Sequence, residues 1–95
     1  RAVETVARLA ELLEPHDADQ AARLFERALD AEPLAQAYSR RLMRLYARRG
    51  EHAQALRVWR RCCTLAALAE GAGPSAETRA LAQSLGLPDW RPPAA

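Results

Sequence analysis

Residues 33–66 decide the fold, and they read PLAQAYSRRLMRLYARRGEHAQALRVWRRCCTLA. On both sides of Gly50, apolar side chains recur every three or four residues, which is the spacing of amphipathic helices. The expected helices cover about residues 34–49 and 52–69, and Gly50 supplies the left-handed conformation that commonly closes a helix. Their apolar stripes are Tyr38, Leu42, Leu45 and Tyr46 in the first helix, and Ala55, Leu56, Trp59, Cys62, Leu65 and Ala66 in the second. This stretch predicts an antiparallel helical hairpin.

The preceding residues predict a second pair of helices. Pro15 ends an apolar pattern over about residues 2–14, and Asp17 or Asp19 is the expected N-cap of a helix that Pro33 stops. The side chains expected to be buried are Val3, Val6, Leu9, Ala10 and Leu13 in the first helix, and Ala21, Leu24, Phe25, Ala28 and Leu29 in the second.

A fifth helix follows the second hairpin. Ser75 is its expected N-cap, and it covers about residues 76–85 and ends at Gly86. Residues 88–95 are rich in proline and are expected to be irregular. Trp90 in this tail is either a handle for a partner or a plug over the last helix, and its short distance from that helix in sequence favours the plug.

Composition supports an all-α chain. Ala and Leu dominate the 95 residues, aromatic residues make up 5%, and β-branched residues are scarce. We therefore expect one helical-repeat domain over residues 1–87 and an irregular tail over residues 88–95. Cys62 and Cys63 are adjacent, so a disulfide between them would distort the backbone, and a reduced, cytoplasmic protein is the simpler interpretation. No apolar run is long enough to cross a membrane, and no membrane partner is expected.

The two hairpins share a spacing of small and aromatic residues. At an offset of 34 residues, Ala21 aligns with Ala55, Phe25 with Trp59, and Ala28 with Cys62. With Pro33, Leu42, Tyr46, Ala55 and Trp59 at the matching motif places, residues 33–66 resemble a tetratricopeptide repeat. This resemblance implies about two antiparallel helical hairpins with a capping C-terminal helix. The first helix does not align in the same register, and Ala-rich antiparallel helices can show such coincidences by chance.

A narrower resemblance covers residues 32–85. There a repeat hairpin is followed by a Gly-rich turn and by Gly73, Pro74, Ser75, Glu77, Thr78, Arg79, Ala80 and Leu81, an ending similar to that of the bacterial transcriptional activator domain. Ala76 stands where that family often has proline, and the usual acidic, β-branched lead-in to the turn is missing. The resemblance implies a regulator in which this domain follows a DNA-binding winged helix, with an ATPase domain in some members. Neither neighbour lies within these residues, so no nucleic-acid contact is assigned to this chain.

Charge divides the chain into an acidic and a basic part. Residues 1–34 hold four Arg and eight acids, whereas residues 35–69 hold eight Arg and one acid. Arg40, Arg44 and Arg48 lie four residues apart on the third helix, so they predict a row that could grip carboxylates. The candidate partners are proteins, namely an acidic segment, the chain's own flanking domains or a second copy. A merely solvated row is the alternative.

The other polar residues predict no catalysis. His16 and His52 lack neighbours at metal-ligand spacing, and the glycines lack the pattern of a phosphate-binding loop, so no cofactor is expected. Arg57, Arg60 and Arg61 could touch phosphates, but contact with solvent or with the acidic second helix is the better interpretation. The sequence thus predicts a non-catalytic protein-interaction or self-association module of a bacterial transcriptional regulator. The alternatives are a tetratricopeptide adaptor unrelated to transcription and the scaffold of a helical enzyme.

Overall fold

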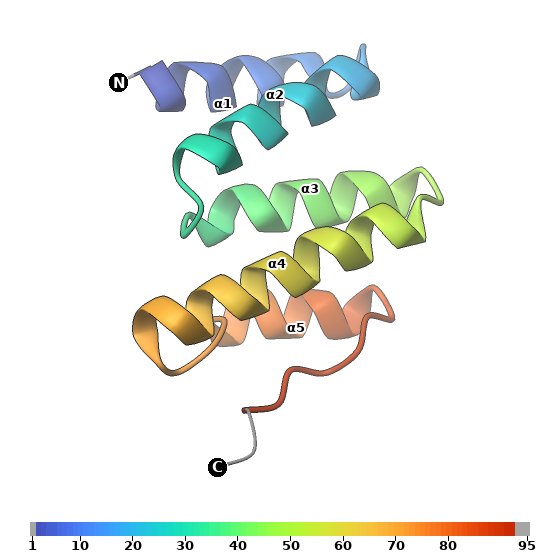
Figure 1. Ribbon diagram of the computed structural model, residues 1–95. Helices are drawn as coiled ribbons and strands as arrows, with labels where there is room; N and C mark the ends of the chain where they lie inside the picture. The colour runs from blue at the N-terminus through green and yellow to red at the C-terminus, as the bar shows by residue number, and fades with distance from the viewer. Residues whose placement is uncertain (1, 93–95) are drawn as a thin grey trace.

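The computed structural model of the chain describes residues 2–92, apart from the side chain of Glu70. Helices α1 (Ala2–Leu13) and α2 (Ala18–Ala31) form the first hairpin, α3 (Gln36–Arg48) and α4 (His52–Glu70) form the second, and α5 (Ala76–Ser84) packs against α3. Figure 1 shows the second hairpin stacked below the first and α5 at the lower end of the stack. The predicted all-α architecture of tetratricopeptide-like hairpins with a final capping helix is confirmed.

The helix ends follow from local chemistry. A side-chain oxygen of Asp17 accepts a hydrogen bond from the backbone N–H of Gln20 at 3.1 Å, and Ser75 Oγ accepts one from the N–H of Thr78 at 3.2 Å. Each bond satisfies an N–H that has no carbonyl partner in the first turn of its helix. Gly50 lies between the helices of the second hairpin with φ of 73°. The expected caps of α2 and α5 are therefore confirmed.

The core contains the residues that the repeat comparison paired. All six side chains are at most 4% exposed, and they are Ala21, Phe25 and Ala28 in α2 and Ala55, Trp59 and Cys62 in α4. Small residues let neighbouring helices approach closely. The Phe25 ring lies under Arg41 of the second hairpin, and Trp59 of the second hairpin contacts Pro88 after α5. The sequence repeat is therefore a repeat of packing.

Leu9 was expected in the core, and this expectation is wrong. The Leu9 side chain is 48% exposed, and the fully buried positions of α1 are Ala7 and Ala10. Helix α1 lies at the end of the stack and contacts other helices on one side only (Figure 1). Its apolar residues span more of its circumference than that one side can cover, so Leu9 is left on the outer surface.

The segment after α5 packs back onto the domain. Leu87 is buried, and Trp59 Nε1 donates a hydrogen bond to the backbone carbonyl of Pro88 at 2.7 Å. The guanidinium of Arg79 lies 5.5 Å from the centre of the Trp90 ring, in a cation–π contact. As expected, Trp90 is half-buried against the fold, and residues 87–92 contain no regular secondary structure. The rest of the expected irregular tail, residues 93–95, lies outside the described residues.

Candidate protein-binding face

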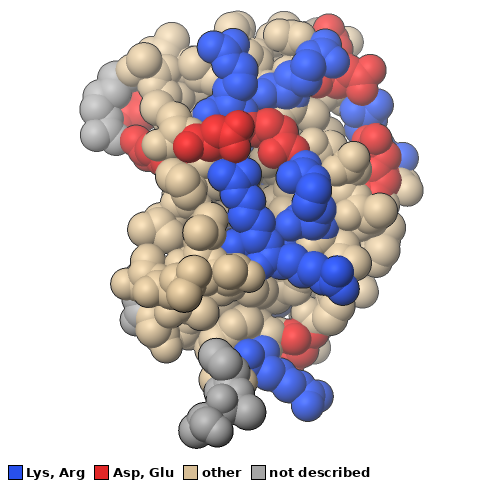
Figure 2. Space-filling view, in the orientation of Figure 1, with Lys and Arg blue, Asp and Glu red and all other residues tan. Residues whose placement is uncertain are grey.

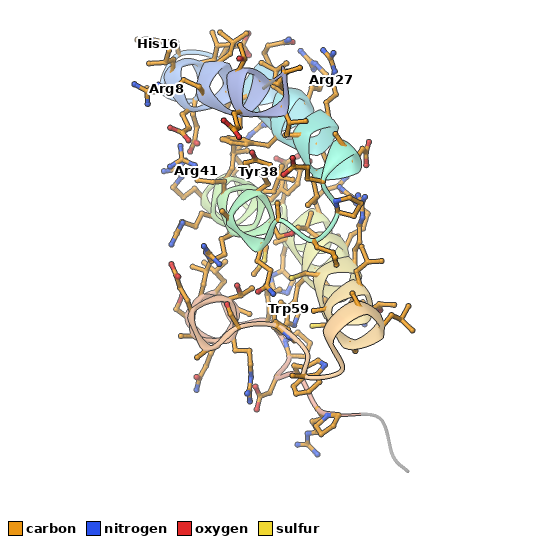
Figure 3. All side chains as sticks on the ribbon, turned by 90° about the vertical axis from the view of Figure 1, so that its left-hand side faces the viewer. Arg8, His16, Arg27, Tyr38, Arg41 and Trp59 are labelled. Carbon is orange, nitrogen blue, oxygen red and sulfur yellow. The ribbon has the colours of Figure 1, made fainter. Side chains whose placement is uncertain are left out.

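Helices α1, α3 and α5 form one face of the molecule, which we call the α1/α3/α5 face. Figure 3 shows these three helices on one side of the stack and α2 and α4 on the other. Arg8 and Arg41 extend from the α1/α3/α5 face, whereas Arg27 extends from the opposite side. The three arginines that the sequence singled out all lie on α3, in the middle of the stack.

Arg40 holds α5 against α3. Its Nη1 donates to Thr78 Oγ1 at 2.9 Å, and its Nε lies 3.5 Å from a carboxylate oxygen of Glu77. The Arg40 side chain is only 17% exposed. Gln36 strengthens the same junction, because its Oε1 accepts hydrogen bonds from Thr78 Oγ1 and from the backbone N–H of Ser75. The guanidinium of Arg40 is therefore engaged inside the domain.

Arg48 reaches across to the first hairpin. It forms an ion pair with Glu14, which also accepts a hydrogen bond from Arg41 Nη2 at 3.2 Å. The Glu14 side chain is 13% exposed, and Arg41 lies over the ring of Phe25 at 5.4 Å from its centre. A shallow hollow of about 400 Å³ lies at this junction, and it is lined by Glu11, Glu14, Pro15, Arg41 and Arg48.

Arg44 differs from its two neighbours in the row. It is exposed, and it has no hydrogen bond or ion pair with another residue in the part of the chain that the structure describes. Arg48 also remains 65% exposed despite its contact with Glu14. The structure thus divides the predicted row into an internal tie, Arg40, and two cations that a partner can reach, Arg44 and Arg48.

Sequence reasoning missed Glu14 and Arg41. Residues 14 and 41 are far apart in sequence, and no local pattern indicates that they meet. The available signal was the charge imbalance between the acidic first part of the chain and the basic second part. In the structure, arginines of the second hairpin form ion pairs with acidic residues of the first.

The opposite face shows the same pairing of charges. Arg57 binds Glu26, and Arg61 Nη1 donates to Asp30 at 3.1 Å, so two arginines of α4 meet the acids of α2. In Figure 2 a band of acidic side chains crosses this face with arginines above and below it. Arg57, Arg60 and Arg61 were expected to contact solvent or the acidic second helix, and the structure shows Arg57 and Arg61 paired with that helix and Arg60 exposed.

Tyr46 joins this network from α3. Its hydroxyl donates to Glu26 Oε2 at 2.7 Å. The pKa of Tyr46 is raised from 10.0 to about 12, chiefly by burial and then by the hydrogen bond and charge of Glu26, while the charge of Arg57 acts in the opposite direction. The folded state therefore favours the neutral phenol more than the unfolded state does.

This shift predicts a loss of stability at high pH. The contribution of Tyr46 is fully present below pH 10 and is lost as the pH rises toward 12, because the unfolded chain then releases a proton that the folded chain keeps. We expect the urea midpoint of the reduced protein to fall more steeply between pH 9 and 12 than that of Tyr46→Phe. Tyr38→Phe serves as the control and should keep the steep fall. Parallel curves for the parent and Tyr46→Phe would contradict the assignment.

The two cysteines are free thiols. Burial raises the pKa of Cys62, and it raises the pKa of Cys63 to about 12. A thiol with a raised pKa carries little thiolate at neutral pH and is a poor nucleophile. Among the side chains that the structure describes, no group of three or more His, Cys, Asp and Glu could hold a metal ion, and none of the described helices is long and apolar enough to span a membrane.

Comparison with models of protein families identifies the family of this domain. The model of the bacterial transcriptional activator domain matches residues 1–85. The chain belongs to this family. The match begins at residue 1, so the domain includes α1 and α2, although α1 does not align with the tetratricopeptide register, and it ends at the C-cap of α5. No curated protein and no solved structure matches the domain.

Proposed function

We propose that this domain is a non-catalytic protein-interaction module of a cytoplasmic bacterial transcriptional regulator. Its α1/α3/α5 face binds an acidic protein segment, and other parts of the regulator contact DNA. The observation that carries the proposal is Arg44, an exposed guanidinium with no partner among the described residues, one turn from the exposed Arg48. Membership of the family favours a role in transcription over a general adaptor.

The chemistry of the face supports this occupant. Arg presents a planar fork of donors that matches a carboxylate with two parallel hydrogen bonds. Arg44 and Arg48 are four residues apart and lie about 6 Å apart along the helix axis, so they can hold two carboxylates of one extended segment. Glu14 already neutralises part of the charge of Arg48. Arg44 therefore makes the larger contribution.

Binding is tested with a fluorescein-labelled peptide of ten residues that alternates Glu and Gly, and with the matching Lys/Gly peptide. We expect the acidic peptide to raise its fluorescence anisotropy with the domain, and binding to weaken at least ten-fold in Arg44→Glu, about 1.4 kcal/mol. Arg27→Glu on the opposite side of the stack is the matched control and should bind as the parent does. Equal binding by the two variants would refute the proposal.

Arg40 provides a separate prediction, because its role is within the domain. Arg40→Glu removes its bond to Thr78 and places a carboxylate beside Glu77, so we expect thermal or urea unfolding to show a loss of about 1–3 kcal/mol. Arg44→Glu should change stability by less than about 0.5 kcal/mol. A destabilised Arg44→Glu alongside an unaffected Arg40→Glu would reverse the assigned roles.

A further inference from the structure

A second surface of the domain is separate from the α1/α3/α5 face. Four large apolar side chains are exposed among residues 2–92, and the most exposed is Leu68 of α4, at 79%. Leu34 is 48% exposed and directly follows Pro33 at the corner between the hairpins. Between this corner and α4 lies a hollow of about 410 Å³, lined by Pro33, Arg60, Arg61, Thr64 and Leu65. We call this hollow, together with Leu68, the α4 patch.

The α4 patch has an apolar half and a cationic half. Arg61, Leu65 and Leu68 occur at spacings of four and three residues, so they lie on one side of the helix. The rise of 1.5 Å per residue places Leu65 about 6 Å and Leu68 about 10 Å beyond Arg61 along the axis. The patch therefore presents charge at one end and leucine at the other.

The charge of the patch is of one sign. Its lining contains two arginines and no acid. Arg61 binds Asp30 but stays 31% exposed, and exposed Arg60 has no hydrogen bond or ion pair with any residue the structure describes. A wholly apolar partner would leave Arg60 desolvated without a counter-charge, which is unfavourable.

We infer that the α4 patch docks an acidic amphipathic helix of a partner protein. The occupant carries a carboxylate that meets Arg60 or Arg61 of the patch. Four and seven residues further along, it carries leucine-like side chains that cover the hollow and contact Leu65 and Leu68 of α4. This spacing lets one helix face satisfy both halves of the patch, as in other helix-in-groove complexes. The site shares no residue with the proposed Arg44 site, so each can fail without the other.

The probe is a labelled, Ala-rich helical peptide with two adjacent Glu residues and with Leu four and seven residues after the first. Three matched peptides replace both Glu by Lys, replace both Leu by Ala, or scramble the order and so break the spacing. We expect the intact domain to bind the Glu/Leu peptide at least ten-fold more tightly than each of the others. Failure to bind it, or equal binding of the Leu-to-Ala or scrambled peptide, overturns the inference.

Variants locate the contact. We expect Arg60→Glu and Leu68→Ser each to weaken binding of the Glu/Leu peptide at least ten-fold, and Arg60→Glu to improve binding of the Lys/Leu peptide. Arg61 is left intact because it also holds Asp30. Leu12→Ser, at a leucine of α1 that is 56% exposed, and Arg44→Glu are the controls and should leave binding unchanged.

Two other outcomes would count against binding of a partner helix at the α4 patch. Loss of binding in Arg44→Glu, with Arg60→Glu unaffected, assigns the peptide to the α1/α3/α5 face. Light scattering of the unliganded protein provides the last check. A dimer that both Leu12→Ser and Leu68→Ser dissociate would show that a second copy, rather than a partner helix, covers the patch.

Discussion

Replacing Trp59 by Ala lowers the free energy of unfolding by about 3–5 kcal/mol, the usual range for deleting a buried aromatic side chain. Trp59 is 3% exposed, and it takes part in two levels of structure. Its ring fills the core position equivalent to Phe25 in the first hairpin, and its Nε1–H holds the carbonyl of Pro88. Its loss therefore leaves a cavity and releases the segment after α5.

Urea denaturation followed by circular dichroism measures this effect, and Trp59→Phe separates its two parts. Phe keeps much of the ring volume but lacks the N–H, so we expect an intermediate loss of stability. In Trp59→Phe, Trp90 is the remaining tryptophan. Its fluorescence should shift to longer wavelength if the hydrogen bond from Trp59 to Pro88 holds the segment after α5 in place. A Trp59→Ala protein as stable as the parent would show that the ring is not part of the core.

The second large effect is expected at Gly73. This residue has φ of 75°, which costs a residue with a Cβ about 1–2 kcal/mol. A Cβ atom there would also lie 2.7 Å from Cη2 of Trp90 and closer still to its Cζ2 and Cε2 atoms. Gly73→Ala should therefore lower stability by both backbone strain and displacement of the Trp90 ring.

A double-mutant cycle separates these two causes. Gly73→Ala in a Trp90→Ala background should cost less than in the parent, because the ring that the new methyl group strikes is absent. Gly71→Ala is the matched control. Gly71 has the same φ of 75° but no atom within 4 Å of its added Cβ, so it reports backbone strain alone. Equal costs for Gly73→Ala in the two backgrounds would show that Trp90 does not lie against Gly73.

Local sequence patterns predicted the elements of this fold because their causes are local. Asp17 and Ser75 cap the helices that follow them, and Gly50 supplies the positive φ that the turn between α3 and α4 requires. The pairing of Phe25 with Trp59 was visible because a repeated unit buries equivalent positions. Such signals need no knowledge of which helices meet.

The candidate site was less accessible to sequence analysis, because its character depends on contacts across the fold. Helical spacing placed Arg40, Arg44 and Arg48 on one row correctly, but it could not show that α5 covers one end of the row and the end of α1 meets the other. For the same reason, Leu9 was expected in the core. An apolar stripe shows which side of a helix faces inward, but how much of the stripe is buried depends on how many helices pack against it.

The segment after α5 also gives the stack a direction. Leu87 is buried, Trp90 packs against the core, and the carbonyl of Pro88 accepts the hydrogen bond from Trp59 of α4, so the chain itself lies against this end of the stack. At the other end, Leu9 and Leu12 of α1 stay exposed. Within the described residues the stack therefore has two unlike ends, one covered by its own chain and one that presents exposed leucines.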